Sequence, residues 1–413
     1  MITEICKKAK AASVEMAKLS ADAKNAALCR MANALEANAD KILAANKSDV
    51  EAAKTKGLKT ALLDRLALDQ RKIQTMAKCL REVSALADPI GTIISSWTRP
   101  NGLIISQVRV PLGVIGVIYE SRPDVTSDAA GICIKSGNAV ILRGGSDALN
   151  SNVAIGDVLR DALVETNVPV DAVQVVNSPD RKVAEELMRM RQYIDVLIPR
   201  GGADLIKTVV ETSRIPVIET GTGNCHVYVE EDADLEKATP IVINAKCQRP
   251  GTCNAAEKLL VHSKIAKRYL PVVIAALRKE GVEVRGDEET RKIVPDVKAA
   301  TEQDWYTEYS DLIIGVKVVK NLDEAIAHIN KYGTHHSDSI LTTDFDKAMH
   351  FIHEVDSAAV YWNASTRFTD GNQFGLGAEI GISTQKLHAR GPMSAQHLTT
   401  TKYVVLGSGQ IRK

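Results

Sequence analysis

A cysteine and a glutamate, each followed or preceded by glycines, are the residues of this chain best suited to covalent chemistry. Cys253 lies in the turn-rich run Gln-Arg-Pro-Gly-Thr-Cys-Asn at 248–254, and Glu219 ends an apolar run and precedes Thr-Gly-Thr-Gly at 220–223. Glycine lets a ligand approach the backbone, and a thiol can accept an acyl group. An isolated cysteine is more often a small buried apolar residue. The hypothesis that Cys253 is a nucleophile therefore depends on its surroundings.

Two further segments place an arginine and two glycines at the end of a predicted strand. One contains Arg143 and Ser146, and the other contains Arg200, Gly201 and Gly202. A helix N-terminus after such a turn favours anions. Neither segment matches G-x-G-x-x-G or the phosphate-loop pattern, so either one alone could be a plain turn. Two of them on successive strand–helix units predict a dinucleotide site.

Adjacent histidines, His335 and His336, follow a predicted helix and precede a predicted strand. Neighbouring side chains point apart, and Asp338 is the one acidic candidate nearby, whereas zinc sites gather three or four ligands. We therefore expect anion recognition or loop hydrogen bonds here, and no metal site. The basic loop 385–393, which contains Arg390, is either a second anion-binding element or a solvated turn.

Composition limits the class of protein. The 413 residues are 45% apolar and 25% charged, with a net charge of +1, which gives no electrostatic signature of nucleic acid or an anionic membrane. The seven cysteines are odd in number and contain no C-x-x-C pair, which favours a reducing compartment. No stretch approaches 18 apolar residues. We expect a cytoplasmic protein without nucleic-acid or membrane partners.

The order of helix-prone and strand-prone segments along the chain predicts an α/β fold. Residues 1–91 read as helices, with Leu28, Met31, Leu35 and Ile42 on one face and Asp69 as an N-cap. Two β-prone runs at 92–110 flank a Pro-Asn-Gly turn, which predicts a hairpin that is either an oligomerisation arm or an ordinary part of a sheet. Short β-branched runs then alternate with helices up to residue 382. The tail at 398–406 reads as a strand that needs a partner edge.

Three motifs give the chain a resemblance to a known family, the aldehyde dehydrogenase superfamily. They are Pro-Leu-Gly-Val-Ile-Gly at 111–116, Glu-Thr-Gly-Thr-Gly at 219–223, and Gly-Thr-Cys at 251–253. The resemblance extends from about Lys8 to the tail. Two longer stretches, 119–125 and 319–338, are similar to one member that reduces an acyl phosphate.

The resemblance implies a specific architecture. It comprises a doubly wound parallel-sheet cofactor domain, a second α/β catalytic domain and a β-hairpin oligomerisation arm. The expected segments are the first part of the NADP-binding domain at 1–91, the hairpin at 92–110, the second part at 111–222, the catalytic domain at 223–382, and a return segment with the oligomerisation strand at 383–413.

The resemblance also implies site residues. Cys253 is the acyl-accepting nucleophile and Glu308 holds the nicotinamide ribose. Arg143 stands at the adenine ribose, and Ser146 replaces a glutamate common in NAD-preferring members, so NADP is favoured. Gly201 and Gly202 face the pyrophosphate.

Two residues depart from the hydrolytic members of the family. Ser121 occupies the place of an oxyanion-binding asparagine, which leaves the Cys253 backbone N–H as the other donor. Glu219 matches a glutamate that activates water, and in a reductase it would position or tune the thiol instead.

The implied reaction is the NADPH-dependent reduction of L-glutamyl 5-phosphate to L-glutamate 5-semialdehyde and phosphate, the second step of proline biosynthesis. The alternatives are a hydrolytic NAD(P)-dependent semialdehyde dehydrogenase and a non-catalytic scaffold. A glutamate 5-kinase is the expected partner, and a homodimer or homotetramer the expected assembly. The candidates for binding phosphate and the glutamyl head are Arg122, Lys246, Arg249, His335, His336 and Arg390.

Overall fold

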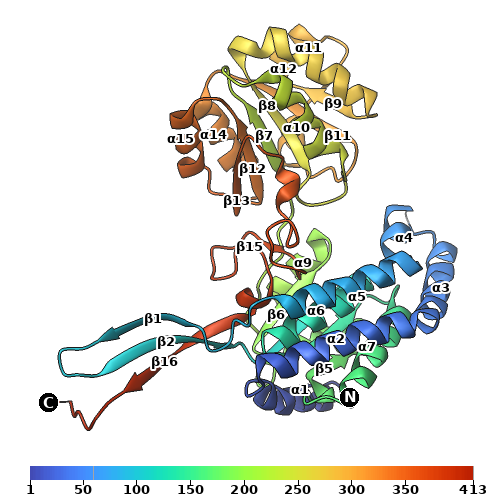
Figure 1. Cartoon of the computed structure of the whole chain (residues 1–413). Coiled ribbons are helices and arrows are strands. Elements are labelled where there is room, and N and C mark those ends of the chain that lie inside the picture. The colour runs from blue at the N-terminus through green and yellow to red at the C-terminus, as the bar shows by residue number, and fades with distance from the viewer. Residues whose placement is uncertain (59, 413) are drawn as a thin grey trace. The chain divides into compact units, whose positions relative to one another are not determined.

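Two compact units make up the chain in the computed structural model, which describes residues 1–58 and 60–412, with no account of the side chains of residues 60 and 61 (Figure 1). Unit 1 comprises Met1–Thr220, Gly375–Gly381 and Met393–Lys413. Unit 2 comprises Gly221–Phe374 and Ile382–Pro392. The expected boundary after residue 222 thus lies two residues beyond the observed one. The expected return at 383 is replaced by two excursions of the chain, at 375–381 and 382–392.

A four-stranded parallel sheet forms the centre of unit 1. Its order is β5-β4-β3-β6, from β3 (Val114–Tyr119), β4 (Ala139–Gly144), β5 (Val173–Val175) and β6 (Val196–Arg200). Helices α6 (Asp124–Lys135) and α7 (Leu149–Leu163) pack on the strands and on each other, and α1 (Ile2–Met16) contacts both β3–β5 and α8 (Arg181–Leu187). Strands β3 and β4 are buried along their whole length, as expected for a parallel sheet covered by helices.

An outer helical layer covers α6 and α7. It consists of α2 (Ala21–Ala37), α3 (Ala39–Thr55), α4 (Thr60–Leu66) and α5 (Gln70–Ala85). The predicted apolar face is confirmed for Leu28, Met31 and Leu35, which lie on α2 and are fully buried. Ile42 is fully buried as well, but it lies on α3 and does not share their helical face. The predicted N-cap is confirmed as well, since the Asp69 carboxylate accepts a 2.7 Å hydrogen bond from the Lys72 N–H at the start of α5.

Three antiparallel strands extend away from the helical layer of unit 1 (Figure 1). They are β1 (Ile93–Thr98), β2 (Ile104–Pro111) and β16 (Thr399–Leu406), in the order β1-β2-β16. The predicted hairpin is therefore present, and the tail strand takes the free edge of β2 within the same chain. Large apolar side chains on these strands are exposed, among them Ile93, Trp97, Tyr403 and Val405.

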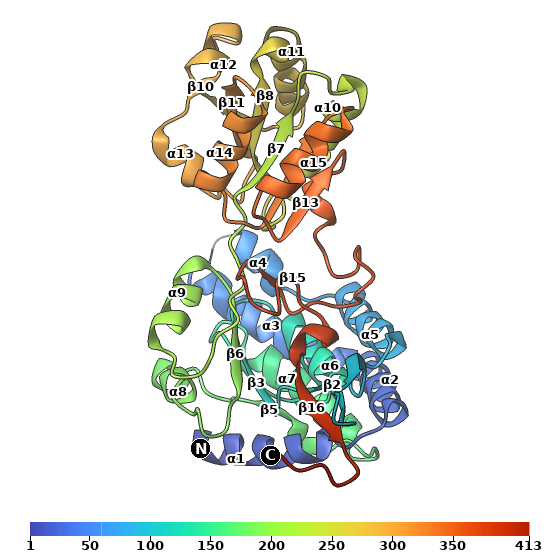
Figure 2. The same cartoon turned by 90° about the vertical axis from the view of Figure 1, so that its left-hand side faces the viewer.

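Unit 2 contains a seven-stranded parallel sheet with helices on both faces (Figure 2). Its order is β10-β9-β11-β8-β7-β12-β13, from β7 (Cys225–Val229), β8 (Ala256–His262), β9 (Glu283–Gly286), β10 (Lys298–Ala299), β11 (Ile313–Val319), β12 (Ser337–Leu341) and β13 (Ala359–Trp362). Helices α10 (Leu235–Cys247) and α11 (Ser263–Lys279) bury one apolar cluster with the sheet. Helices α14 (Leu322–Tyr332) and α15 (Phe345–Glu354) bury another.

Shorter elements connect these layers. They are η1 (Val170–Ala172), α9 (Ala203–Thr212), α12 (Glu288–Ile293), α13 (Glu302–Tyr306), η2 (Thr366–Phe368), β14 (Ile382–Ser383), β15 (Gly391–Pro392) and η3 (Ala395–Leu398). Outside the named strands, Val217 makes one isolated bridge, to Leu197. No helix in the described part of the chain is long and apolar enough to cross a membrane.

The two sheets present their predicted ligand-binding residues at opposite strand ends. In unit 1 the carboxyl ends of β3, β4 and β6 are level, because Tyr119 pairs with both Gly144 and Arg200. The Arg-Gly-Gly segments lie at those ends, as the ligand rule for parallel sheets predicts. In unit 2, Cys253, Glu308 and the two histidines precede β8, β11 and β12, so they lie at amino ends.

Candidate active site

Cys253 lies in the turn between α10 and β8 and is packed against the glycine loop of unit 2. A β-carbon placed on Gly223 would lie 1.4 Å from the Cys253 carbonyl oxygen, a separation no side chain can adopt. Beneath the turn, the Cys225 thiol donates to the same carbonyl oxygen over 3.1 Å. Gly223 and Cys225 thus fix the backbone of Cys253. Cys253 itself is only half-buried.

The competing thiols are poorly suited to nucleophilic attack. Burial raises the pKa of Cys225 well above its usual value, and nearby Asp338 raises it further. Burial also raises the pKa of Cys247. Because the thiolate is the reactive form, these two residues are expected to stay protonated at neutral pH.

Glu308 shares Gly223 with Cys253. The Gly223 N–H donates to the Glu308 carboxylate, and burial raises the pKa of that carboxyl although this hydrogen bond and His336 oppose the change. The glycine loop of unit 2 therefore touches both the predicted nucleophile and the residue predicted to hold the nicotinamide ribose.

A buried lysine and asparagine connect three loops of the site. The Lys258 Nζ donates to the Asn224 Oδ1 over 2.7 Å and to the Thr307 carbonyl over 2.8 Å. The Asn224 amide in turn donates to the carbonyls of Trp305 and Tyr332, at 2.7 and 2.8 Å. Burial lowers the pKa of Lys258 to about 7. Lys258 and Asn224 therefore tie the glycine loop at 221–223 to the segment 305–308 that leads to Glu308 and to the end of α14 that precedes the two histidines.

The two histidines have different partners. His335 has a positive φ of 59°, and its Nδ1 lies 2.7 Å from the Asp356 carbonyl oxygen. The Arg390 guanidinium also donates to Asp356, to the carboxylate over 3.0 Å and to the backbone carbonyl over 2.9 Å. His336 is buried, with its Nδ1 2.8 Å from Ser337 Oγ and 3.8 Å from the Cys225 sulfur. His335 and Arg390 thus form one group, and His336 lies under the nucleophile turn.

Arg367 is a cation at the nucleophile turn that the sequence reasoning missed. Its guanidinium binds Asn254 Oδ1, and its Nε donates to Gln248 Oε1 over 2.8 Å. Burial lowers its pKa, and the neighbouring charge of Arg249 adds to this, so the two arginines lie close together. Lys246, by contrast, is fully buried and binds Glu257 at 2.9 Å, which removes it from the candidates for an incoming phosphate.

In unit 1, Ser121 follows β3 in a strained conformation. Its φ is 38°, unusual for a residue other than glycine, and its hydroxyl donates to the Asp147 carboxylate. Glu219 lies outside the helices and strands, at the end of the first segment of unit 1, where the hydroxyl of Thr220 donates to the Pro199 carbonyl over 2.8 Å. The three predicted catalytic residues therefore divide between the units, with Ser121 and Glu219 in unit 1 and Cys253 in unit 2. Arg122, also in unit 1, is half-buried.

The carboxyl ends of β4 and β6 carry groups that fit a phosphorylated dinucleotide. The Arg143 guanidinium is buried and its Nε has no hydrogen-bond partner, while Ser146 is exposed beside it. Burial lowers the pKa of Arg143, and the charge of nearby Arg181 adds to this. Positive charge and a donor without a partner favour the binding of an anionic group. Arg181 was not predicted from the sequence.

The start of α9 is held by a carboxylate of the same chain. The Gly202 N–H donates to Glu120 Oε2 over 3.0 Å, and a β-carbon on Gly201 would lie 2.5 Å from that oxygen. The absence of side chains at Gly201 and Gly202 therefore makes room for an anion at the helix N-terminus. A pyrophosphate at this position would compete with Glu120.

Comparison with known proteins agrees with this arrangement. The family model described as "Aldehyde dehydrogenase family" matches residues 1–309. A gamma-glutamyl phosphate reductase from Caldanaerobacter subterraneus subsp. tengcongensis is 60% identical over 407 residues, which cover 98% of each chain. The chain belongs to the aldehyde dehydrogenase family.

Further relatives of this chain are also named gamma-glutamyl phosphate reductase. A gamma-glutamyl phosphate reductase from Carboxydothermus hydrogenoformans is 59% identical and covers 100% of this chain and 99% of its own. The crystal structure of gamma-glutamyl phosphate reductase from Thermotoga maritima has a TM-score of 0.97 and 55% identity, with 100% of each chain covered. The predicted α/β aldehyde dehydrogenase fold is confirmed, and the family implies a nicotinamide cofactor.

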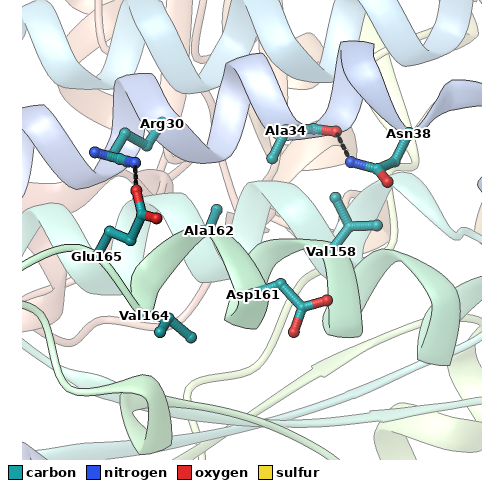
Figure 3. A pocket seen from close by; sticks show the side chains of 8 residues that line it. All are labelled: Arg30, Ala34, Asn38, Val158, Asp161, Ala162, Val164 and Glu165. Atoms are coloured by element: carbon teal, nitrogen blue, oxygen red, sulfur yellow. Dashed lines mark hydrogen bonds and ion pairs between the residues drawn. The ribbon is translucent and has the colours of Figure 1, made fainter.

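Two other features of this chain, an acidic cluster and a surface pocket, do not include the predicted site residues. At the carboxyl ends of β7 and β8, Glu230, Glu231 and His262 could together hold a metal ion, but the Lys347 ammonium binds Glu230 at 3.1 Å and Glu231 at 3.3 Å and already supplies the positive charge. A shallow surface pocket lies between α2 and α7 (Figure 3). An ion pair between Arg30 and Glu165 crosses one end of it, and no nucleophile or buried charge lines it.

Proposed function

We propose that this chain reduces L-glutamyl 5-phosphate to L-glutamate 5-semialdehyde and phosphate through a thioester on Cys253. The observation that carries the proposal is the packing of Gly223 against the Cys253 carbonyl, with Glu308 bound to the same glycine. Gly223 thus brings the Cys253 turn close to the Glu308 carboxylate, which we propose binds the cofactor. The full-length relatives named gamma-glutamyl phosphate reductase support the same substrate.

In the proposed mechanism the Cys253 sulfur attacks the C5 carbonyl carbon, the C5–O bond to phosphate breaks, and a thioester forms. A nicotinamide cofactor, which Glu308, Gly201 and Gly202 would hold, would supply the hydride for reduction of the acyl group, and Cys253 would be released as the thiolate. Arg249 and Arg367, close to the nucleophile turn, are the proposed partners of the leaving phosphate. His335 and Arg390 are held by Asp356 and are proposed to line the substrate entrance. Glu219 is proposed to position or tune the thiol.

For the cofactor we propose NADPH. The buried Arg143 with its unpartnered Nε, the nearby Arg181 and the small exposed Ser146 favour a 2′-phosphate over a free hydroxyl. We propose as well a cytoplasmic enzyme that receives its labile substrate from a glutamate 5-kinase. The exposed apolar strands β1, β2 and β16 support a homodimer or homotetramer, and a chain that sediments as a monomer at micromolar concentration would contradict that assembly.

The nucleophile assignment is tested with three cysteine variants. We expect Cys253→Ala to abolish turnover while binding NADPH as tightly as the wild type. Cys247→Ala is the matched control and should keep most of the activity, because that thiol is half-buried with a raised pKa. If Cys253→Ala stayed active and Cys225→Ala did not, the nucleophile would be Cys225.

A further inference from the structure

Two consecutive charged residues of β8, Glu257 and Lys258, lie on opposite faces of the sheet of unit 2. The next two residues of the strand show this, because Leu259 packs in the apolar cluster of α10 and α11 and Leu260 in that of α14 and α15. Side chains alternate along a strand, so Glu257 shares the face of Leu259 and Lys258 that of Leu260. Both charged residues are fully buried. Charged side chains are almost never buried without partners, and both pairs of partners lie around Glu308.

Lys258 occupies a narrow path on the face covered by α14. Its pairing partner on β11 is Gly315, and a β-carbon at Gly315 would lie 2.9 Å from the Lys258 Cδ and 3.2 Å from the Trp305 ring. At the end of this path the ammonium lies 4.7 Å from the centre of the Tyr309 ring. The absence of a side chain at Gly315 therefore makes room for the lysine stem, and the packing around the stem fixes the place of its ammonium.

The Lys258 ammonium bridges the two residues next to the hydrogen bond between Gly223 and Glu308. It donates to the Asn224 Oδ1 over 2.7 Å and to the Thr307 carbonyl over 2.8 Å. Asn224 follows Gly223, and Thr307 precedes Glu308, so the bridge and the hydrogen bond close a ring. A shift of Glu308 away from Gly223 would therefore also strain buried hydrogen bonds to a charged group, which are stronger than neutral ones.

Glu257 holds the same segment from the other face, two residues after Glu308. Its Oε1 accepts from the Ser310 N–H over 3.1 Å, and its Oε2 accepts from the Lys246 ammonium over 2.9 Å. Ser310 has a φ of 53°, a conformation that a residue other than glycine keeps only where its surroundings impose it. The segment 307–310 is thus held at both ends, by a cation on one face of the sheet and by a carboxylate on the other.

The buried lysines also act on the charge of Glu308. Burial raises the pKa of the Glu308 carboxyl, whereas Lys246 and Lys258 are among the groups that lower it. An ionised carboxylate can accept hydrogen bonds from hydroxyl groups at both of its oxygens. The two lysines therefore favour the form of Glu308 that is best suited to hold a ribose.

We propose that Lys258 and Glu257 are positioning residues, which hold the Glu308 carboxylate in the place where it binds the nicotinamide ribose. This inference rests on the proposed function, which gives Glu308 that role, and all three residues belong to unit 2. Hydride transfer should depend on the two positioning residues more than thioester formation does, because the Cys225 thiol also holds the backbone of Cys253.

Lys258→Met tests the proposal because it keeps the apolar stem and removes the ammonium. In the oxidative direction with NADP and phosphate, kcat should fall about 10- to 100-fold, as expected when a reacting group is misplaced by up to about 1 Å. The KM for glutamate 5-semialdehyde and the rate at which iodoacetamide alkylates Cys253 should stay close to the wild-type values. With deuterium at the aldehyde carbon, the isotope effect on kcat should rise, because hydride transfer becomes the slow step. Lys317→Met, at a half-buried lysine of β11, is the matched control and should keep the wild-type kcat and isotope effect.

A cycle with Glu308→Gln tests whether the positioning residues act through Glu308. Residues that act through one another are not additive, so Lys258→Met should lower kcat far less in the Glu308→Gln background than in the wild type. Glu257→Gln repeats the cycle and carries the test if Lys258→Met does not fold, since one amide oxygen cannot serve both Ser310 and Lys246. A loss of kcat that multiplies with that of Glu308→Gln, or that leaves the isotope effect unchanged, would overturn the proposal.

NADPH binding separates this inference from the reaction assignment. The fluorescence of NADPH titrated with the full chain measures affinity and needs no turnover. Lys258→Met should weaken NADPH binding in the wild-type background and leave it nearly unchanged in the Glu308→Gln background. That result in a chain that reduces no glutamyl phosphate and oxidises no semialdehyde would support the positioning role and contradict the proposed function. Additive losses of affinity in a chain with phosphate-dependent turnover would overturn the positioning role and leave the proposed function intact.

Discussion

Gly223 and Cys253 are in direct backbone contact, so close that a β-carbon at residue 223 would lie 1.4 Å from the Cys253 carbonyl oxygen. The atoms of Cys253 that meet Gly223 are backbone atoms, so a change of side-chain rotamer could not relieve a clash. Any side chain at residue 223 therefore displaces the nucleophile turn. The same displacement reaches Glu308, whose carboxylate accepts from the Gly223 N–H.

The first prediction concerns this contact. Gly223→Ala should lower kcat by about 100-fold or more, the cost of misplacing a reacting group by about 1 Å. Affinity for NADPH should fall less, because Arg143 and the α9 start lie in unit 1. Gly281→Ala is the control for backbone strain that displaces no neighbour: Gly281 has a φ of +80° in the turn after α11, so this substitution should lower stability and leave kcat unchanged. Wild-type kcat in Gly223→Ala would show that the turn is not held as the structure indicates.

Cofactor preference provides the second prediction. Ser146→Glu should shift the ratio of kcat/KM for NADP over NAD toward NAD by about 10- to 100-fold, because a carboxylate repels the 2′-phosphate and accepts from a free 2′-hydroxyl. Steady-state kinetics with both cofactors measures it. An unchanged ratio would mean that Arg143 and Arg181 alone read the phosphate.

A buried histidine provides a pH-dependent prediction. His328 packs against the rings of Trp305, Tyr332 and His226, and burial, followed by the charge of His226, lowers its pKa to about 2. Lys317, Lys258 and Lys331 act in the same direction. In the unfolded chain a histidine titrates near pH 6.5. The unfolded state therefore binds the proton that the folded state refuses, and stability falls as the pH drops below about 6.5.

His328→Phe should remove this contribution. Relative to its own value at pH 7, the wild type should lose about 2 kcal/mol more free energy of unfolding at pH 5 than the variant. Chemical denaturation at the two pH values measures this difference, and His353→Phe serves as the control because its side chain is 85% exposed. Equal pH slopes for wild type and His328→Phe would mean that His328 is protonated in the folded state.

Local patterns predicted what local interactions determine. The Asp69 cap, the apolar face of Leu28 and Met31, and the β-branched runs of β3 and β4 are set by neighbours a few residues away. Cys253, Glu219 and Glu308 were predicted from family motifs, of which those around Cys253 and Glu219 contain glycines. Their division between two units also follows from the strand–helix alternation.

The residues that were missed come close only in three dimensions. Arg367 follows β13, the edge strand of the seven-stranded sheet, by several residues, yet it binds Asn254 beside the nucleophile. Arg181 begins α8, in another strand–helix unit, and its charge contributes to the lowered pKa of Arg143. The composition of segments 375–381 and 382–392 does not show that the chain crosses between the units there. The position of each segment is set by its packing on the rest of its unit. Lys246 was misjudged for the converse reason, since its buried partner Glu257 cannot be recognised from sequence spacing alone.

The dependence of turnover on inorganic phosphate distinguishes a reductase from a hydrolytic dehydrogenase. With NADP and glutamate 5-semialdehyde, the account predicts almost no reduction of NADP until phosphate is added, saturation with phosphate, and an acyl phosphate that hydroxylamine traps as a hydroxamate. A water-activating role for Glu219 predicts the opposite. Rapid phosphate-independent formation of free glutamate, lost in Glu219→Gln, would contradict the account and show the chain to be a hydrolytic dehydrogenase.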